Sequence, residues 1–358
     1  MKRLAFCINN LKVGGAEKLL IDLINNWPNN YVLYLLLLEE RNDLINLIDS
    51  SRLIRIIYVT KNTNVYRKIS FIRNFFIKEG INICFSHLEK SNKICLLSSF
   101  LTKTRVIPVV HSINIYNSSN WSVKFISKLI YKFYAKMVVA ISEPVMSYCI
   151  IGLGISKSRL VKIDNGIDFK RVKNNKRDVS FDGGINFAVL GRMEFVKGYD
   201  YLLDVLGSEV FKDSNWTLRF IGDGKEFHNL LEKTNKLSIN GKIQFLGYKE
   251  NPFDYLTDVH YLLMPSRREG LPISLLESLS FGIPVIVSDV GVLPEIVKDG
   301  YNGFVFKVED EKMLGDTLLK CLRISTVKYE ELSINAGISV LEYSIENCIS
   351  KYIELVNV

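Results

Sequence analysis

The chain has 358 residues, of which 48% are hydrophobic and 23% are charged, with 46 Lys and Arg against 38 Asp and Glu. This balance is typical of globular proteins and excludes a disordered or fibrous chain, and the length predicts two domains. The longest apolar run, Tyr31–Leu38, is far shorter than the roughly 20 residues of a membrane-spanning helix. We also expect no signal peptide, because polar residues follow the N-terminus within a few positions.

The six cysteines are scattered along the chain and form no CxxC pair, and no His stands at ligand spacing from them. Small buried thiols are the natural interpretation. We therefore expect no disulfide framework, no metal site, and a protein of the reducing cytoplasm.

The charge is divided unevenly between the halves of the chain. Residues 1–180 contain 28 Lys and Arg and 12 Asp and Glu, a formal charge of +16, whereas residues 181–358 contain 18 and 26, a charge of −8. This asymmetry indicates that the first half faces an anionic partner. Because no nucleic-acid-binding signature accompanies the charge, we expect a phosphorylated substrate or an anionic membrane rather than nucleic acid.

Short apolar runs alternate with longer helical patterns in both halves, which is typical of α/β domains with mostly parallel sheets. The strands predicted in the first half are Arg3–Ile8, Tyr31–Leu38, Ile54–Val59, Ile81–Ser86, Arg105–Val110 and Met137–Ile141. Those predicted in the second half are Asn186–Leu190, Trp216–Ile221, Lys242–Leu246, Tyr261–Met264, Val285–Ser288 and Gly303–Phe306. We predict two doubly wound, Rossmann-like domains facing across a cleft, with ligands at the C-terminal ends of the strands.

A basic, aromatic helix is predicted over Trp121–Met137. Its lysines recur every fourth residue, at Lys124, Lys128, Lys132 and Lys136, with apolar residues between them. A second basic and aromatic segment is Tyr66–Lys78. Such a helix can lie on an anionic membrane surface, or its lysines can form a solvated face while its apolar side packs on a sheet. Both interpretations remain open.

Gly14 and Gly15 follow the first strand and precede a helical pattern, Lys18–Ile24. Glycines there allow a ligand to approach the backbone, and the helix N-terminus can bind an anion, although a tight turn would explain the pair equally well. The segment Ile163–Asp168, at the junction of the halves, is interpreted as a hinge turn.

Two cations are predicted at the end of the strand Asn186–Leu190. Gly191-Arg192 ends it, and Lys197-Gly198 stands just before a predicted helix, Tyr199–Leu206. Arg offers a planar fork and Lys a point charge, which together suit a diphosphate. The alternative is two solvated loop cations.

The segment 265–277, PSRREGLPISLLE, follows the strand Tyr261–Met264. Pro272 suits the first position of a helix that runs to about Phe281, so the amides at its N-terminus provide a seat for phosphate. Glu269 precedes the helix and can accept hydrogen bonds from sugar hydroxyls, while Glu277 can hold a ribose diol. Two surface glutamates are the alternative, but Glu277 lies in an apolar run. The residues of this phosphate seat are Gly270, Leu271, Pro272, Ile273 and Ser274.

Together these motifs resemble the retaining glycosyltransferases of family four, which have the GT-B fold. The resemblance covers almost the whole chain. Its most specific part is the pair Glu269 and Glu277, with seven residues between them. The other matching motifs are Gly14–Glu17, Asn165–Asp168, Gly191-Arg192, Lys197-Gly198, Gly222–Gly224, Phe245–Gly247, Gly282–Val285 and Pro294–Val297.

The resemblance implies transfer of a sugar, with retention and without a metal or other cofactor, from a nucleotide-diphosphate donor, UDP-linked rather than GDP-linked. The acceptor would be a lipid-linked oligosaccharide, such as a polyprenyl-diphosphate-linked glycan, or a surface polysaccharide such as O-antigen, capsule or lipopolysaccharide. Arg192 and Lys197 would stabilise the diphosphate, and Glu269 and Glu277 would bind sugar and ribose. Tyr248 and the preceding Phe245–Gly247 would lie beside the base.

His111 matches the family's histidine near the reacting sugar, and His87 is a weaker rival for that role. The predicted domains are 1–169 for the acceptor and 185–342 for the donor, joined by an Asn- and Gly-rich linker, 170–184, with little to bury. A C-terminal helix, 343–358, would cross back to the first domain, as in the family.

The sequence departs from the family pattern at Asp164, His260 and Val292, where Pro, Asp and Gly are common, and Val292 leaves the sugar preference open. Two other classes remain as alternatives. One is a nucleotide-sugar epimerase of related architecture, and the other is a non-catalytic module that binds a membrane or a partner. Contact with the inner face of the cell membrane would make the protein peripheral.

Overall fold

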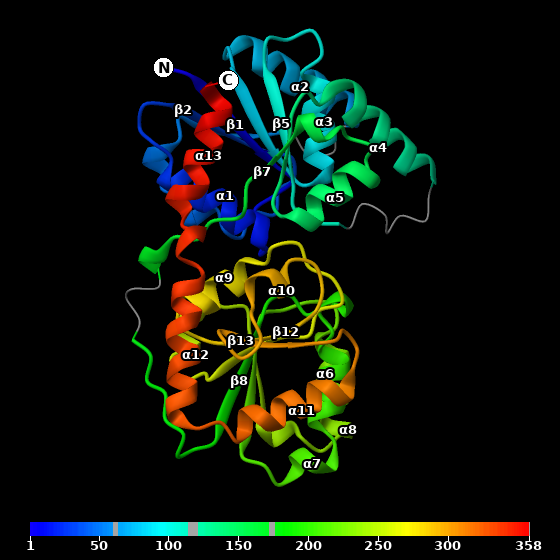
Figure 1. Ribbon diagram of the computed structural model, residues 1–358. Helices are drawn as coiled ribbons and strands as arrows, with labels where there is room; N and C mark the ends of the chain where they lie inside the picture. Colours follow the sequence, from blue (N-terminus) through cyan, green and yellow to red (C-terminus); the bar gives the residue numbers. More distant parts are fainter. Residues whose placement is uncertain (60–63, 114–120, 172–175, 358) are drawn as a thin grey trace. The chain divides into compact units, whose positions relative to one another are not determined.

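A computed structural model describes residues 1–59, 64–113, 121–171 and 176–357. The chain divides into two compact units. Unit 1 contains Met1–Ile167 and Ile345–Val358, and unit 2 contains Asp168–Ser344. In each unit a central sheet is covered by helices (Figure 1). The two crossings between units therefore fall near residues 168 and 345, compared with expected boundaries after residues 169 and 342.

Within the described residues, the sheet of unit 1 has seven strands in the order β3-β2-β1-β4-β5-β6-β7, and all neighbouring pairs are parallel. The strands are β1 Arg3–Ile8, β2 Val32–Leu37, β3 Arg55–Tyr58, β4 Ile83–His87, β5 Arg105–Val110, β6 Val138–Ala140 and β7 Leu160–Lys162. Every strand predicted for this half is present within two residues. The sequence did not predict β7, because it is three residues long and only Leu160 in it is fully buried.

The helices of unit 1 cover both faces of this sheet. They are α1 Gly15–Asn26, α2 Val65–Lys78, α3 Glu89–Ser98, α4 Trp121–Tyr134, α5 Glu143–Ile151 and α13 Ile345–Asn357. The C-terminal α13 packs beside α1 (Figure 1). Tyr352, which is 1% exposed, places its ring 5.1 Å from that of Phe85 in β4 and 6.4 Å from that of Trp27. This buried aromatic group explains why the end of the chain belongs to unit 1.

Within the described residues, the sheet of unit 2 has six parallel strands in the order β10-β9-β8-β11-β12-β13. The strands are β8 Ile185–Leu190, β9 Trp216–Ile221, β10 Ile243–Gly247, β11 Tyr261–Met264, β12 Val285–Ser288 and β13 Gly303–Phe306. The helices are α6 Tyr199–Leu206, α7 Glu209–Lys212, α8 Phe227–Lys236, α9 Ile273–Ser280, α10 Leu293–Ile296, α11 Glu311–Leu322 and α12 Thr326–Ser339. The predicted strands agree with these within one residue.

Short 3-10 turns connect several of these elements. They are η1 Ile45–Leu47, η2 Ser50–Arg52, η4 Lys157–Arg159, η5 Phe169–Arg171, η6 Phe195–Lys197, η7 Asn240–Lys242, η8 Pro252–Tyr255 and η9 Leu341–Tyr343. Among the described residues, no helix combines the length and the hydropathy needed to span a bilayer.

The segment expected to be a linker is partly packed against unit 2. Arg177 donates hydrogen bonds to the hydroxyl of Tyr329 (2.6 Å), to Ser333, and to the carbonyls of Val259 and Gly282. The ring of Phe181 lies 5.1 Å from that of Tyr329. This differs from the expectation of a stretch with little to bury, because its partners come from elements far along the chain. Residues 172–175 lie outside the described residues.

Candidate active site

The loops after β8, β9 and β10 are joined through their backbones at the C-terminal edge of the sheet of unit 2. The amide of Gly191 donates to Ile221 (3.0 Å), that of Met193 to Asp223 (2.9 Å), and that of Gly222 to Gly247 (2.9 Å). Gly222 has φ +145°, and a Cβ there would overlap the carbonyl oxygen of Gly191. The predicted Gly191-Arg192 turn is therefore held in place by glycines that permit close backbone contact.

Lys197 and Glu269 form the central ion pair of this edge. Lys197 Nζ lies 2.7 Å from Glu269 Oε1, and the hydroxyl of Ser266 donates to the same oxygen at 2.7 Å. The side chains of Lys197 and Glu269 are only 17% and 10% exposed. Both residues were predicted as catalytic, and the structure brings them together from loops that are 72 residues apart.

Arg267 fastens these two loops to each other. Its guanidinium makes a bidentate pair with Asp200 (2.8 and 2.8 Å), donates to Glu309 (2.6 Å) and stacks on the ring of Phe195 (3.9 Å to the centroid). Burial opposes ionisation of Asp200, but the bonds from Arg267 outweigh it and lower the pKa of that carboxyl. The backbone amide of Arg267 also donates to the carbonyl of Val196, which is next to Lys197.

Sequence reasoning missed Arg267. The residue belonged to the motif that was singled out, but the sequence does not show which distant carboxylates a basic loop residue will meet. The same holds for Gly291, which has φ +57° and where a Cβ would overlap the carbonyl oxygen of Glu269. Gly291 allows the loop after β12 to lie directly against Glu269.

The helix α9 follows Glu269 as predicted, although it begins at Ile273 and Pro272 is the residue before it. The side chains of Leu271 and Ile273 are buried, so only their backbones can face a ligand. Gly270 precedes the first residue of α9, and Ser274 is the second residue of the helix. Glu277 lies just over one turn into α9 and is 6% exposed, so it is not a surface glutamate.

Arg192 and Tyr248 occupy more open positions at the same edge. The side chain of Arg192 is 58% exposed and pairs with Glu194 (2.9 Å), and it makes no ion pair with Glu269. Tyr248 follows β10 and is 37% exposed. Phe245, three residues earlier, stacks on Phe220 (4.7 Å between centroids) and packs against the core.

In unit 1, Gly14 and Gly15 stand at the start of α1, at the C-terminal edge of the sheet. The carbonyl of Gly14 accepts from the amide of Lys18 (3.0 Å), so the helix begins three residues earlier than predicted. The Glu17 carboxylate lies over Gly14 in the space that a Cβ would take. The glycines therefore start the helix as the motif required.

The two candidate histidines of unit 1 lie in direct contact. His87 ends β4 and His111 follows β5, and His87 Nδ1 is 2.9 Å from His111 Nε2. Burial lowers the pKa of both rings, that of His111 to about 4, and the nearby His111 lowers the pKa of His87 further. The sequence treated them as rivals for one role, whereas the structure makes them a pair.

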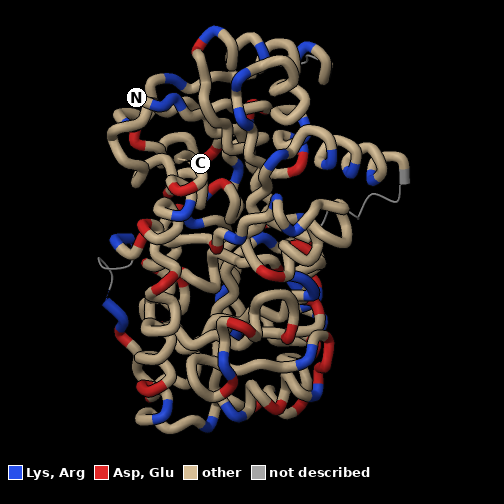
Figure 2. Tube along the Cα trace, turned by 45° about the horizontal axis from the view of Figure 1, so that its top comes forward, with Lys and Arg blue, Asp and Glu red and all other residues tan. Residues whose placement is uncertain are grey.

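The basic helix α4 buries Tyr131 but leaves several other large apolar side chains exposed. Ser127 and Tyr131 on its inner face are buried, as is Ala135 just after the helix, and the Tyr131 hydroxyl donates to Glu89 of α3 (3.0 Å). The exposed face carries both lysines and apolar side chains, and Figure 2 shows the successive lysines along the helix. The exposed apolar residues are Val123 (39%), Phe125 (47%), Ile126 (53%) and Phe133 (71%).

The observed helix differs from the predicted one in its end and in the exposure of its lysines. The helix ends at Tyr134 rather than at Met137, and its inner side packs on α3, with Tyr131 buried and Leu129 and Ile130 partly buried. Lys128 and Lys132 on the helix and Lys136, two residues after its end, are exposed, whereas Lys124 is partly buried. A spacing of four residues drifts around a helix of 3.6 residues per turn, so Lys124, the first of the four, lies off the line of the exposed lysines.

The six cysteines are buried and unpaired, as predicted. No group of three or more His, Cys, Asp or Glu side chains is placed to hold a metal ion within the part of the chain that the structure describes.

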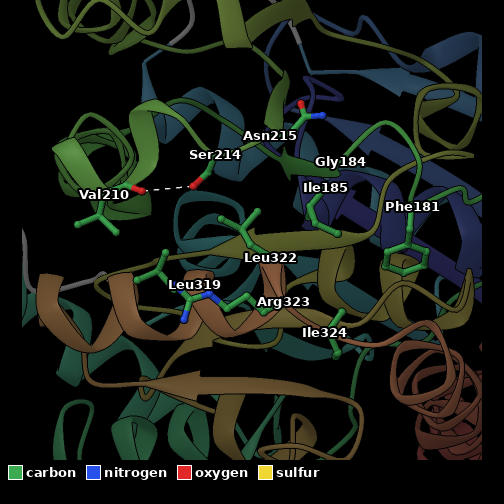
Figure 3. A pocket seen from close by; sticks show the side chains of 10 residues that line it. All are labelled: Phe181, Gly184, Ile185, Val210, Ser214, Asn215, Leu319, Leu322, Arg323 and Ile324. Atoms are coloured by element: carbon green, nitrogen blue, oxygen red, sulfur yellow. Dashed lines mark hydrogen bonds between the residues drawn. The ribbon is translucent and has the colours of Figure 1, made fainter.

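Unit 2 contains a pocket of about 530 Å³ (Figure 3). Its lining at the starts of β8 and β9 places it at the opposite edge of the sheet from the Lys197–Glu269 pair. It is lined by the start of β8, the segment before β9 and the end of α11, including Ile185, Asn215 and Arg323. Because ligands of open parallel sheets bind beyond the C-terminal ends of the strands, this pocket is not the expected ligand site.

Comparisons with known proteins agree with this geometry. Two Rossmann-like units with parallel sheets define the GT-B class of fold. Over its whole length the chain superimposes on the Anabaena protein Alr3699/HepE in complex with UDP and glucose, with a TM-score of 0.86 at 16% identity and full coverage of both chains. Residues 171–337 match the model of the family described as "Glycosyl transferases group 1".

Among curated relatives, the chain is 33% identical to an uncharacterized 41.2 kDa protein in the cps region of Klebsiella pneumoniae, over 45% of each chain. It therefore spans about half the length of that relative. It is 22% identical, over 83% of this chain and 82% of the other, to an Escherichia coli protein. That protein is named UDP-Gal:alpha-D-GlcNAc-diphosphoundecaprenol alpha-1,3-galactosyltransferase.

Proposed function

We propose that this protein is a retaining, metal-independent glycosyltransferase of the hexosyltransferase class. It transfers a sugar from a nucleotide-diphosphate donor, UDP-linked rather than GDP-linked, to a lipid-linked oligosaccharide or surface-polysaccharide precursor. The observation that carries the proposal is the buried Lys197–Glu269 pair beside the start of α9, in a segment of the glycosyltransferase family.

The proposed roles follow from charge and position. Lys197 and Arg192 stabilise the charge that grows on the leaving diphosphate, and the backbone at the start of α9 binds the same anion. Before the donor binds, Glu269 neutralises Lys197 at 2.7 Å. When the donor binds, phosphate replaces Glu269 as the partner of Lys197, and the carboxylate becomes available to sugar hydroxyls. Glu277 holds the ribose, and Tyr248 lies beside the base.

Donor and acceptor are proposed from the names of similar proteins together with the charge of unit 1. UDP occurs in the structure of the Anabaena protein and in the name of the Escherichia coli enzyme, which also names a diphosphoundecaprenol acceptor. Unit 1 holds 24 Lys and Arg against 12 Asp and Glu, a formal charge of +12 that suits an anionic acceptor.

The test is a transfer assay with UDP- and GDP-sugars and a polyprenyl-diphosphate-linked acceptor, with EDTA present throughout. We expect one UDP-sugar to react and the product to keep the anomeric configuration of the donor, as read by NMR. Failure of every donor to bind, hydrolyse or transfer would contradict the proposal. Conversion of a UDP-sugar without any acceptor would instead indicate an epimerase. Binding of the sugar donor without any turnover would indicate a non-catalytic module.

We also propose that α4 binds an anionic membrane surface at the inner face of the cell membrane. The specific observation is the exposure of Phe125, Ile126 and Phe133 together with Lys128 and Lys132 on this helix, and of Lys136 two residues after its end. Between Glu89 and Glu143 the sequence contains eight Lys and Arg and no acidic residue, so this positively charged segment is complementary to an anionic surface. Buried aromatic area and about 1 kcal/mol per lysine at an anionic surface would act together.

Vesicle sedimentation tests this second proposal, with phosphatidylglycerol-containing vesicles compared with neutral ones. Replacing Lys128, Lys132 and Lys136 by Gln should weaken binding to the anionic vesicles about a hundredfold or more. The matched control replaces three exposed lysines of unit 2, Lys236, Lys312 and Lys328, and so removes the same total charge. Equal losses in the two triple variants would rule out α4 as the contact.

A further inference from the structure

His87 and His111 form a hydrogen-bonded pair that is buried at one end and reaches solvent at the other. The rings are 5.1 Å apart between centroids and inclined by 31°, and the Nδ1 to Nε2 distance is 2.9 Å. His87 is fully buried, whereas His111 is partly exposed. The inner ring can therefore act on a ligand only through the outer one.

The backbone around the inner ring is fixed from several sides. The carbonyl of His87 accepts from the hydroxyl of Ser91, and Asn92 donates to the carbonyl of Val109, which pairs with His87 in the sheet. Leu88, directly after His87, has φ +72°, a strained conformation for a residue with a Cβ. Strain of this kind persists where surrounding contacts impose it, often beside functional groups.

One proton is shared between the two rings, and burial decides where it lies. Both rings are neutral near pH 7, so either His87 Nδ1 or His111 Nε2 donates across the 2.9 Å contact. Among the described residues, Nε2 of His87 is buried and has no hydrogen-bond partner. If His111 were the donor, His87 would carry its proton on that buried Nε2, and orphaned N–H groups are rarer than unpaired acceptors.

We propose that His87 is a positioning residue whose Nδ1–H donates to His111 and holds that ring in the tautomer with its proton on Nδ1. His111 then presents a permanent N–H donor to the hydroxyl of a sugar or acceptor and does not act as a base. This assignment rests on the proposed function for the identity of the ligand. The hydrogen bond and the tautomer can be tested without any substrate.

The direct test is a long-range ¹H–¹⁵N spectrum of the full-length protein labelled at its four histidines, recorded at pH 7. We expect His111 to be neutral with its proton on Nδ1 and His87 to be neutral with its proton on Nδ1. A proton on Nε2 of His111, or a charged His111 at that pH, would overturn the proposal. The result does not depend on whether the protein is active.

Kinetics with a matched pair of amide variants provide the second test. His87→Asn places an N–H donor near the position of Nδ1, whereas His87→Gln extends its donor toward the position of Nε2. We expect His87→Asn to retain the His111 tautomer and most of kcat. His87→Gln and His87→Leu should lower kcat by about 10- to 100-fold, which is the usual effect of losing a partner that orients a functional histidine. KM for the nucleotide-sugar substrate should not change.

A double-mutant cycle separates positioning from simple support of the fold. If His87 acts through His111, then His87→Leu added to His111→Ala should cause no further loss of kcat. Full additivity of the two losses would contradict the proposal, and thermal unfolding of each variant identifies those that fail to fold. Lack of transfer by the unaltered protein would reject the proposed function, while the spectrum would still decide the tautomer.

Discussion

The two units differ in how their positively charged side chains are paired. In unit 2, which holds 22 Lys and Arg and 26 Asp and Glu, the cations of the site are neutralised by partners close by. Lys197 pairs with Glu269, Arg267 with Asp200 and Glu309, and Arg192 with Glu194. Unit 1 instead exposes lysines on α4, whose sequence contains no acidic residue. Unit 2 thus holds individual charges in fixed positions, whereas unit 1 presents a broad positive surface.

This difference distinguishes two kinds of anion binding. A buried, paired cation such as Lys197 is oriented before the ligand arrives, and it acts in surroundings where each charge counts for more than in water. A stripe of exposed lysines attracts any anionic surface and is screened by salt. We therefore expect chemistry to be sensitive to single substitutions in unit 2, and association to depend on summed charge in unit 1.

The largest effect should come from breaking the buried pair of unit 2. Lys197→Ala and Glu269→Ala should each lower kcat by about 100- to 1,000-fold, because the first removes charge stabilisation of the leaving diphosphate and the second removes the carboxylate that binds the donor sugar. Steady-state transfer kinetics provide the measurement. The control pair is Lys236 with Glu232, which has the same 2.7 Å separation but side chains 72% and 66% exposed. Full activity of Lys197→Ala would remove its proposed role.

Gly291→Ala should disturb the same site through the backbone. A Cβ there would overlap the Glu269 carbonyl, and alanine would be strained at φ +57°. We expect either a loss of about 2–4 kcal/mol in unfolding free energy, or a displaced Glu269 and weak binding of the donor sugar nucleotide. Gly300→Ala is the control, since its φ is +70° but nothing lies within 4 Å of the added Cβ. It should lose about 1 kcal/mol, the strain alone. Urea unfolding and donor titration measure both, and equal losses would show that the close approach to Glu269 is unimportant.

Arg267→Met should test whether fixed charge in unit 2 positions the reactive pair. The variant leaves Lys197 and Glu269 in the chain but removes the bonds to Asp200 and Glu309. We expect kcat/KM for the donor to fall about 10- to 100-fold, since small misplacements of catalytic groups are costly. Arg267→Lys should recover little, because a bidentate site requires the planar fork of Arg. Arg323→Met, at the opposite edge of the sheet, should leave the kinetics unchanged.

A smaller effect, shared by the two units, should appear in their response to acid. Burial, followed by the charge of Arg177, lowers the pKa of His260 to about 4, and its Nδ1 accepts from the amide of Asn186 (3.0 Å). A histidine with a lowered folded pKa binds its proton only in the unfolded state between that value and about 6.5, so stability falls as the pH falls through this window.

Between pH 7.5 and 5, His260 should therefore cost about 2 kcal/mol of unfolding free energy, and His87 and His111 impose the same kind of loss on unit 1. His260→Asn, which keeps an acceptor for Asn186, should reduce this pH dependence by about that amount. His228→Asn, at an exposed position of α8, is the control. Urea unfolding at the two pH values gives the measurement, and an unchanged slope in His260→Asn would contradict the assignment.

Much of the fold and part of the site followed from local patterns. Each predicted strand exists because apolar runs bounded by Gly and Pro define buried strands, while β7, with a single fully buried residue, carried too little signal. The predicted seat at Pro272 is displaced by one residue, since helix ends are the least certain part of such a pattern. The exposed apolar face of α4 was not predictable, because periodicity shows that a helix has two faces but not which one is covered.

The amino-acid sequence by itself determined two α/β domains, the residues at the ends of their strands, the buried thiols and the resemblance to a glycosyltransferase family. These are properties of short segments, where hydrophobic spacing and helix-start chemistry act over a few residues. Only the tertiary structure decided that Arg267 joins Asp200 and Glu309, that Gly291 lies on Glu269, and that His87 and His111 form one pair. Each of these depends on groups distant in the chain meeting within about 3 Å or in van der Waals contact, which no local pattern records.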